Sequence, residues 1–182
     1  KKTTNKCINI IREALIREGA PADIIQGIEE PSISLTQELM KRCNLVIATG
    51  GRPMVKSAYS SGVPAYGSGA GNATVIIDDT CSTPEYQAEA AENTRISKCS
   101  DFGSGCSCDG NLIIHEDVYD GFVKALVEQG AYLANEEEAE KLKNVMWDET
   151  GHRLPNTVAI SAQKLAEAAG FTIPEDRKFI AV

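Results

Sequence analysis

A short apolar run that ends in two glycines and leads directly into a helical segment dominates the first half of the chain. The run covers 45–48 and is followed by Thr49-Gly50-Gly51. Its aliphatic residues are typical of a strand that is buried on both faces of a parallel sheet. Segment 52–59 then has helical spacing and a proline in its first turn, where a missing N–H costs nothing. A strand, a glycine turn and a helix in this order predict an α/β fold.

The same alternation of strands and helices continues along the chain. We expect helices at 5–18, 34–41 (with Ser34 as its cap), 52–59, 84–97, 117–129, 136–148 and 162–169, and strands at 24–28, 45–48, 74–77, 111–114, 158–160 and 178–181. Strands that alternate with helices imply mostly parallel sheets. A change of composition near 79–84 predicts a domain boundary there, between parts 1–79 and 80–182.

Charge and cysteine content exclude several classes of protein. The 182 residues include 18 Lys+Arg and 26 Asp+Glu, a net charge of −8, which disfavours binding to the phosphates of nucleic acid. No apolar run reaches the ~18 residues that a membrane helix needs. A chain of this length and apolar content does not need its six cysteines as disulfides. We therefore expect a soluble, cytoplasmic protein that binds neither nucleic acid nor membranes.

Two glycine-rich segments could lie against a ligand. Glycines allow the backbone to approach a phosphate, and the unpaired N–H groups of a helix start attract negative charge, so Gly50-Gly51 could hold a phosphate. The segment lacks the GxGxxG spacing, and a plain strand-to-helix turn remains the alternative. The second cluster, Gly67-Ser68-Gly69-Ala70-Gly71, leads into a strand. Three glycines there indicate that either a neighbouring strand or a flat cofactor ring presses on the backbone.

Cys106 is the strongest candidate for a reactive group. It follows Gly103-Ser104-Gly105, an open stretch that could leave its sulfur accessible as a nucleophile. Cys106 and Cys108 could instead be inert core residues. A metal site formed by Cys99, Cys106 and Cys108 with Asp101 or Asp109 is a further alternative. The C-x6-C-x-C spacing matches no common zinc pattern, so we expect no metal.

The two histidines and one acidic run are expected to have structural roles. His115 and His152 are expected at the surface, and the acidic run at 136–138 is expected to complement the dipole at the start of a helix.

These segments together resemble the aldehyde dehydrogenase superfamily, and more narrowly its coenzyme-A-acylating branch, which includes the aldehyde dehydrogenase half of bifunctional alcohol/aldehyde dehydrogenases. The resemblance is carried by 45–65, by 67–72, by Ser97-Lys98 with Gly105-Cys106-Ser107, and by Val118-Tyr119-Asp120. It spans nearly the whole chain in family order. It implies parts of two Rossmann-like α/β domains: the second half of a dinucleotide-binding domain at 1–79 and the first part of a catalytic domain at 80–182.

The resemblance also implies roles for individual residues. Thr49, Gly50 and Gly51 correspond to the turn that meets the pyrophosphate of NAD or NADP, and Ser68, Gly69 and Ala70 to the backbone beside the nicotinamide ring. Cys106 corresponds to the catalytic nucleophile, and its own N–H to half of an oxyanion hole. Cys99 and Cys108 are additional thiols, and Asp109-Gly110-Asn111 replaces the usual glutamate-containing continuation.

Position 68 distinguishes two kinds of product. Hydrolytic members of the family have a glutamate there that activates water, whereas Ser68 cannot act as such a base at neutral pH. The resemblance therefore implies NAD(P)-dependent oxidation of a small aldehyde to an acyl-CoA, through a thioester on Cys106, with coenzyme A as co-substrate. A hydrolytic enzyme that forms a carboxylic acid and a non-catalytic nucleotide-binding module remain alternatives. The resemblance also implies that the whole enzyme is a homo-oligomer. It further implies that this chain is an internal segment of that enzyme and has little activity by itself.

Overall fold

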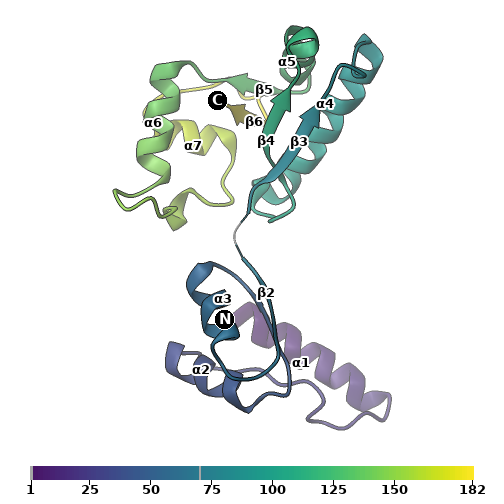
Figure 1. Cartoon of the computed structure of the whole chain (residues 1–182), viewed down its shortest axis with the longest axis vertical. Coiled ribbons are helices and arrows are strands. Elements are labelled where there is room, and N and C mark those ends of the chain that lie inside the picture. Colours follow the sequence, from purple (N-terminus) through teal and green to yellow (C-terminus); the bar gives the residue numbers. More distant parts are fainter. Residues whose placement is uncertain (1, 70) are drawn as a thin grey trace. The chain divides into compact units, whose positions relative to one another are not determined.

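The computed structural model describes residues 2–69 and 71–182, and the chain divides into two compact units (Figure 1). Unit 1 is Lys1–Ala70 and unit 2 is Gly71–Val182. The boundary expected at 79 falls inside unit 2, because the strand before it pairs with a later strand of that unit.

Unit 1 is built around one β-α-β crossover. Its elements are α1 (Lys2–Arg17), α2 (Ile33–Arg42), β1 (Val46–Thr49), α3 (Arg52–Tyr59) and β2 (Ala65–Ser68). β1 and β2 are parallel neighbours, and α3 connects them. Met40, Val46, Ala48 and Ala58 form the small buried core. The predicted strand, glycine turn and helix are therefore confirmed.

Three details of unit 1 differ from the sequence predictions. Segment 24–28 is not a strand, because side chains of α1 take its carbonyls: Arg12 donates from Nε and Nη2 to the Ile25 carbonyl at 3.1 and 3.0 Å. The cap of α2 is Ser32, whose hydroxyl accepts the Leu35 N–H, and not Ser34. β1 is buried on one face only, since Ile47 is 77% exposed.

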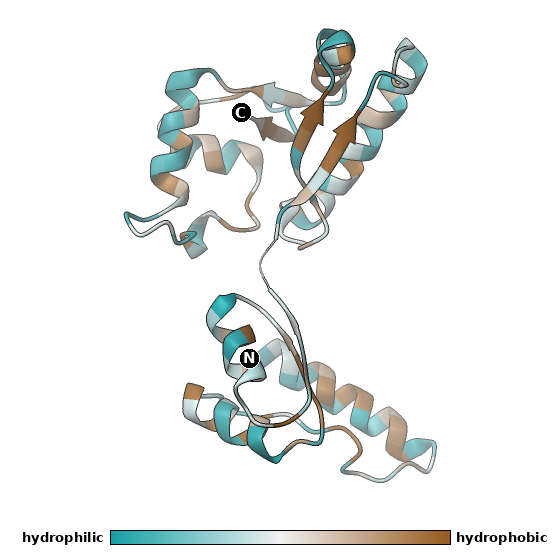
Figure 2. Ribbon diagram, viewed as in Figure 1, coloured by the Kyte–Doolittle hydropathy of each residue, from teal (hydrophilic) through white to brown (hydrophobic). Residues whose placement is uncertain are grey.

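Unit 2 contains two further pairs of parallel strands. Its elements are β3 (Ala73–Ile77), α4 (Pro84–Cys99), η1 (Ser100–Gly103), β4 (Asp109–Ile114), η2 (Glu116–Val118), α5 (Tyr119–Glu128), β5 (Ala131–Leu133), α6 (Glu136–Met146), η3 (Pro155–Thr157), α7 (Ala162–Ala168) and β6 (Phe179–Ala181). β3 pairs with β4 and β5 pairs with β6. The apolar segments of β3 and β4 stand out in Figure 2, and the core surrounds the fully buried Phe122.

Short-range capping signals set the helix starts of unit 2. The Thr83 hydroxyl accepts the Tyr86 N–H at the start of α4. Asn135 and Glu138 form a reciprocal capping box at the start of α6, so the acidic run there is confirmed as a helix N-terminus. Gly170, with φ +80°, follows the end of α7.

Two differences in unit 2 concern strands. Segment 158–160 is not a strand, because Ala159 has a φ of 56° and cannot continue a pleated backbone. β5 was not predicted, because its three residues are too few to show an alternating pattern. All three strand pairs in the described part of the chain are parallel, which confirms the expected sheets. No helix in this part is both long and apolar enough to cross a bilayer.

Candidate functional site

The two glycine-rich segments of unit 1 meet at the ends of adjacent strands. Thr49, the last residue of β1, is the register partner of Ser68, the last residue of β2. The Gly50 N–H donates to the Ser68 carbonyl at 3.1 Å. Thr49, Gly50, Gly51, Ser68 and Gly69 thus lie at one sheet edge, where the carboxyl ends of parallel strands commonly bind ligands. Ala70, the remaining predicted cofactor residue, lies outside the described residues.

Helix α3 begins at this same edge. Gly51 is its N-cap and supplies no side-chain hydrogen bond, and a proline stands in the first turn. The N–H groups of the helix start therefore lack a side-chain acceptor and carry partial positive charge. This is the arrangement that binds a phosphate or a pyrophosphate.

Gly67 has a packing role that the sequence prediction did not anticipate. A Cβ on Gly67 would lie 2.6 Å from Val55 Cγ1 and 2.9 Å from Tyr59 Cε2, and the Gly67 N–H donates to the Tyr59 hydroxyl at 3.0 Å. Helix α3 therefore presses on this glycine, where a neighbouring strand or a cofactor was expected. A Cβ on Gly69 would meet no described atom within 4 Å, so the backbone there is open to a ligand.

Cys106 is exposed on a tight turn of unit 2. The Cys108 N–H donates to the Gly105 carbonyl at 3.1 Å, which closes a turn with Cys106 as its first central residue. The thiol is therefore accessible, and the alternative that Cys106 is an inert core residue is not supported. All six cysteines lie in the described part of the chain, and none of them forms a disulfide.

The backbone before Cys106 is left-handed for three consecutive residues. Asp101, Phe102 and Gly103 have φ values of 49°, 52° and 69°. Such angles are rare for residues that have a Cβ, above all for a bulky one such as phenylalanine. Ser104 stabilises the bend: its N–H donates to the Asp101 carbonyl at 3.1 Å and its hydroxyl to Asp101 Oδ2 at 2.7 Å. The chain thus turns sharply between the end of α4 and Cys106.

The backbone after Cys106 is attached to the same helix. Ser97 Oγ donates to Asp109 Oδ1 at 2.8 Å and accepts the Asp109 N–H at 3.1 Å. These two hydrogen bonds join the last turns of α4 to the first residue of β4. Asp109, noted in the sequence as a departure from the family pattern, therefore holds the end of the Cys106 loop in place.

The other thiols near Cys106 bond to backbone carbonyls. Cys99 Sγ donates to the Lys178 carbonyl at 3.9 Å, and Cys108 Sγ donates to the Ser100 carbonyl at 3.8 Å. Burial raises the pKa of the Cys99 thiol, and burial also raises the pKa of the Cys81 thiol. Cys99 and Cys81 are therefore protonated at neutral pH, and a protonated thiol is a poor nucleophile.

The histidines lie at the surface, as predicted. His115 is exposed and accepts the Asp117 N–H at Nδ1, and His152 is exposed and bonds to the Thr150 hydroxyl. Neither is held beside the Cys106 turn by these contacts. Within residues 2–69 and 71–182, no group of three or more His, Cys, Asp or Glu side chains is arranged to hold a metal ion.

A cavity of about 640 Å³ opens beside the Cys106 loop within unit 2. Phe102, Gly103 and Ser104 line it together with Lys98, and so do residues of α7, of β6 and of the segments that flank α7. Sequence reasoning missed this cavity, the left-handed turn and the Ser97–Asp109 link. The last of these joins residues twelve positions apart, a separation without any periodic signal.

Comparisons with known proteins show the family to which the chain belongs. A family model described as the aldehyde dehydrogenase family matches residues 1–169. The chain belongs to the aldehyde dehydrogenase family. The expectation drawn from the order of its motifs is thereby confirmed.

Two similar proteins of this family are named sulfoacetaldehyde dehydrogenases, and one of the two names specifies an acylating enzyme. A sulfoacetaldehyde dehydrogenase of Acholeplasma sp is 43% identical over 186 residues, which cover 100% of this chain and 37% of that protein. An acylating sulfoacetaldehyde dehydrogenase of Bilophila wadsworthia is 41% identical over 185 residues, covering 100% of this chain and 39% of that protein. This aldehyde dehydrogenase chain therefore spans less than two-fifths of the length of both relatives.

A solved structure has the same fold over nearly the whole chain. The acetylating aldehyde dehydrogenase from Geobacillus thermoglucosidasius superposes with a TM-score of 0.89 at 37% identity, covering 96% of this chain and 38% of that one. In the present aldehyde dehydrogenase chain, the candidate cofactor residues belong to unit 1 and Cys106 belongs to unit 2.

Proposed function

We propose that the whole protein oxidises a small aldehyde to an acyl-CoA, with NAD or NADP as hydride acceptor and a thioester on Cys106 as intermediate. Two relatives support the product class, since they are named as acylating and acetylating enzymes. The observation that carries the proposal is the accessible Cys106 thiol on a turn that is held at both ends. Ser104 bonds to Asp101 before Cys106, and Asp109 bonds to Ser97 of α4 after it.

The chemistry needs few groups from the chain. The Cys106 thiolate adds to the aldehyde carbon, and the Cys106 N–H stabilises the resulting oxyanion. Loss of hydride from that carbon leaves an acyl group on Cys106 as a thioester. The thiolate of coenzyme A then attacks the thioester carbon, which releases the acyl-CoA and restores the Cys106 thiolate.

The edge of the unit 1 sheet fits a dinucleotide. Thr49, Gly50, Gly51 and the start of α3 would hold its pyrophosphate, because N–H groups without a side-chain cap face that edge. Ser68, Gly69 and Ala70 would lie beside the nicotinamide ring, where the open space around Gly69 leaves room. The bound cofactor supplies the acceptor for the hydride.

Ser68 supports transfer to coenzyme A over hydrolysis. A serine hydroxyl without a basic partner does not activate water at neutral pH. The thioester on Cys106 would therefore persist until a stronger nucleophile arrives. A hydrolytic enzyme would instead form the carboxylic acid without coenzyme A, and analysis of the products with and without coenzyme A separates the two.

The decisive variant is Cys106→Ala in the whole protein. We expect acyl-CoA formation to fall by at least about a thousandfold, because the variant lacks the thiol on which the proposed thioester forms. Cys108→Ala is the matched control and should stay within about threefold of the unmodified rate, since its thiol donates to the Ser100 carbonyl and has no role in the proposed chemistry. Near-normal turnover by Cys106→Ala would remove Cys106 from this role.

The location, the oligomeric state and the size of the substrate are proposed from the sequence and from the family resemblance. We propose that the enzyme acts in the cytoplasm as a homo-oligomer on a small aldehyde. Sedimentation of the whole protein tests the oligomer, and a monomer at all concentrations would contradict it.

A further inference from the structure

We propose that the cavity beside the Cys106 loop is a pocket for an anionic group, and that it holds the negatively charged end of the aldehyde substrate. The proposal rests on the proposed function, since it specifies the substrate class of the same enzyme. It assigns the binding of a sulfonate or a carboxylate to Lys98 and Arg153.

The charge of the cavity wall is opposite to that of the chain. Four cations line the cavity, Lys98, Arg153, Arg177 and Lys178, against a single carboxylate, Glu175, although the whole chain carries a net charge of −8. A concave site lined by one sign of charge concentrates ligands of the opposite sign. A volume of about 640 Å³ is ample for a small organic anion.

Lys98 lines the cavity and lies against the Cys106 loop. It is partly buried, and a Cβ on Gly103 would lie 3.6 Å from Lys98 Cε, so the lysine side chain runs along the loop at this glycine. Among the residues that the structure describes, no carboxylate forms an ion pair with Lys98. A partly buried ammonium without a carboxylate partner favours an anionic ligand.

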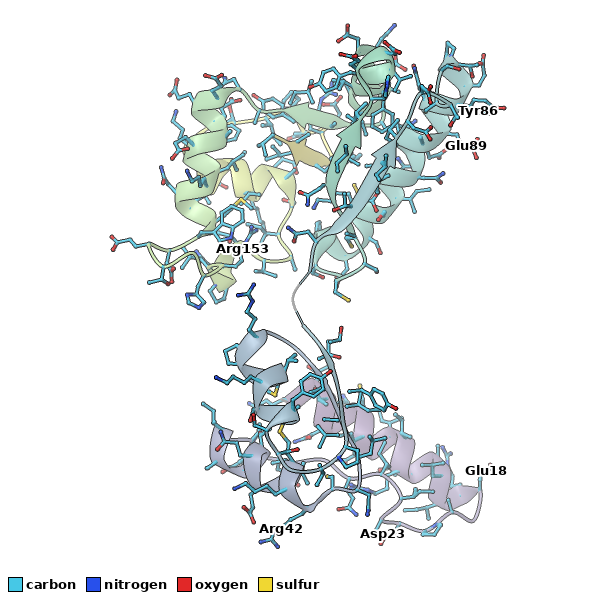
Figure 3. The ribbon with its side chains drawn as sticks, viewed as in Figure 1. Glu18, Asp23, Arg42, Tyr86, Glu89 and Arg153 are labelled. Atoms are coloured by element: carbon cyan, nitrogen blue, oxygen red, sulfur yellow. The ribbon has the colours of Figure 1, made fainter. Side chains whose placement is uncertain are left out.

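Arg153 provides a second cation on the segment after α6 (Figure 3). Its guanidinium stacks over Trp147, 4.9 Å from the ring centroid, and Nη2 donates to the Thr157 carbonyl at 2.8 Å. These contacts fix the plane of the guanidinium and use one of its five donors, which leaves a fork suited to an oxyanion. Within the described ranges no carboxylate pairs with it either.

Arg177 is already committed to the fold. Its Nη1 donates to the carbonyls of Val127 and Ala131 at 2.9 and 3.3 Å, and its Nη2 pairs with Asp176 at 3.4 Å. Lys98, whose side chain runs along the Cys106 loop, and Arg153, whose guanidinium is fixed by Trp147 and Thr157, are the cations to test. Phe102 and Ser104, which precede Cys106 by four and two residues, share the cavity wall with Lys98. An aldehyde whose anionic end is held here would have its carbonyl end near the Cys106 loop under this proposal.

The first experiment measures selectivity between anionic and neutral aldehydes. In the whole protein, kcat/KM is determined with sulfoacetaldehyde, succinic semialdehyde and propionaldehyde. Lys98→Met and Arg153→Gln should each lower the ratio of anionic to neutral kcat/KM by about 10- to 100-fold. Lys98→Arg should keep most of the ratio, because it keeps the charge. Lys124→Met, which removes an exposed cation on α5 outside the cavity, should leave the ratio unchanged.

An unchanged ratio of anionic to neutral kcat/KM in both Lys98→Met and Arg153→Gln would overturn the proposal. This holds whether the variants stay fully active or lose the same fraction of activity with all three aldehydes. If the KM for coenzyme A rises while the ratio is unchanged, the cations would be assigned to the phosphates of coenzyme A instead of the aldehyde.

A binding experiment separates this site from the proposed function. Calorimetric titration of the whole protein with ethanesulfonate, which cannot react, should show binding that weakens about tenfold or more in Lys98→Met. Ethanesulfonate binding without any acyl-CoA formation would reject the proposed function and keep the anion site. Acyl-CoA formation without ethanesulfonate binding would reject the site alone.

Discussion

At the scale of single residues, the environment of each thiol decides its reactivity. Burial raises the pKa of Cys99 and of Cys81, so a smaller fraction of each is thiolate at neutral pH, and the thiolate is the reactive form. Cys106 is exposed. We expect iodoacetamide to label Cys106 at least about tenfold faster than Cys99 at about pH 7.5. Peptide mass spectrometry over time measures both rates, and equal rates would contradict the account.

The Ser97–Asp109 link predicts a stability effect. Ser97→Ala removes both hydrogen bonds between α4 and the start of β4, and should lower the free energy of unfolding by about 1–2 kcal/mol. Urea denaturation of the whole protein measures this. Ser107→Ala, at an exposed position next to Cys106, serves as the control and should change stability by less than about 0.5 kcal/mol.

Single residues also show the limit of sequence reasoning about the site. Cys106 could be found because glycines precede it, and Thr49 and Gly50 because they end an apolar run. Lys98 is noted in the sequence only as part of a family motif, and its place beside Arg153 could not be predicted, because the two are far apart in sequence and only the folded chain brings them to one cavity. The left-handed angles of Asp101 and Phe102 also lack a signal, since the local sequence around them does not require such a turn.

At the scale of elements, Gly67 is packed against helix α3, whereas the nearby Gly69 has open space around it. Gly67→Ala would place a methyl group 2.6 Å from Val55 Cγ1 and should cost about 1–3 kcal/mol of stability. Gly69→Ala meets nothing within 4 Å, so it should leave stability within about 0.5 kcal/mol and instead raise KM for NAD or NADP. Thermal unfolding and cofactor kinetics test the pair. A Gly69→Ala variant with unchanged cofactor KM would remove Gly69 from the cofactor site.

Elements set by local signals were predictable, and those set by distant contacts were not. Thr83 before α4 and Gly170 after α7 act within one helical turn, so the sequence contains the whole signal. Segment 24–28 is apolar enough for a strand, but its carbonyls bond to Arg12 and Asn5 of α1 instead. Segment 158–160 fails for a backbone reason, the positive φ of Ala159.

At the scale of the whole molecule, the strand pairs expose apolar residues on one face. Ile47 and Tyr66 are register partners and are 77% and 70% exposed, and the partners Ile76 and Ile113 are 71% and 56% exposed. Two-stranded sheets with one bare face are marginal on their own. The chain also spans less than two-fifths of the curated relatives described above. Activity is therefore a property to measure on the whole protein.

Mass spectrometry of the acylated enzyme tests the central claim most directly. The whole protein is incubated with propionaldehyde and NAD, and in parallel with NADP, without coenzyme A, and is then digested. We predict a propionyl group on the peptide that carries Cys106, and its disappearance within seconds after coenzyme A is added. Propionyl-CoA formed by a protein whose Cys106 never gains the acyl group would contradict the account.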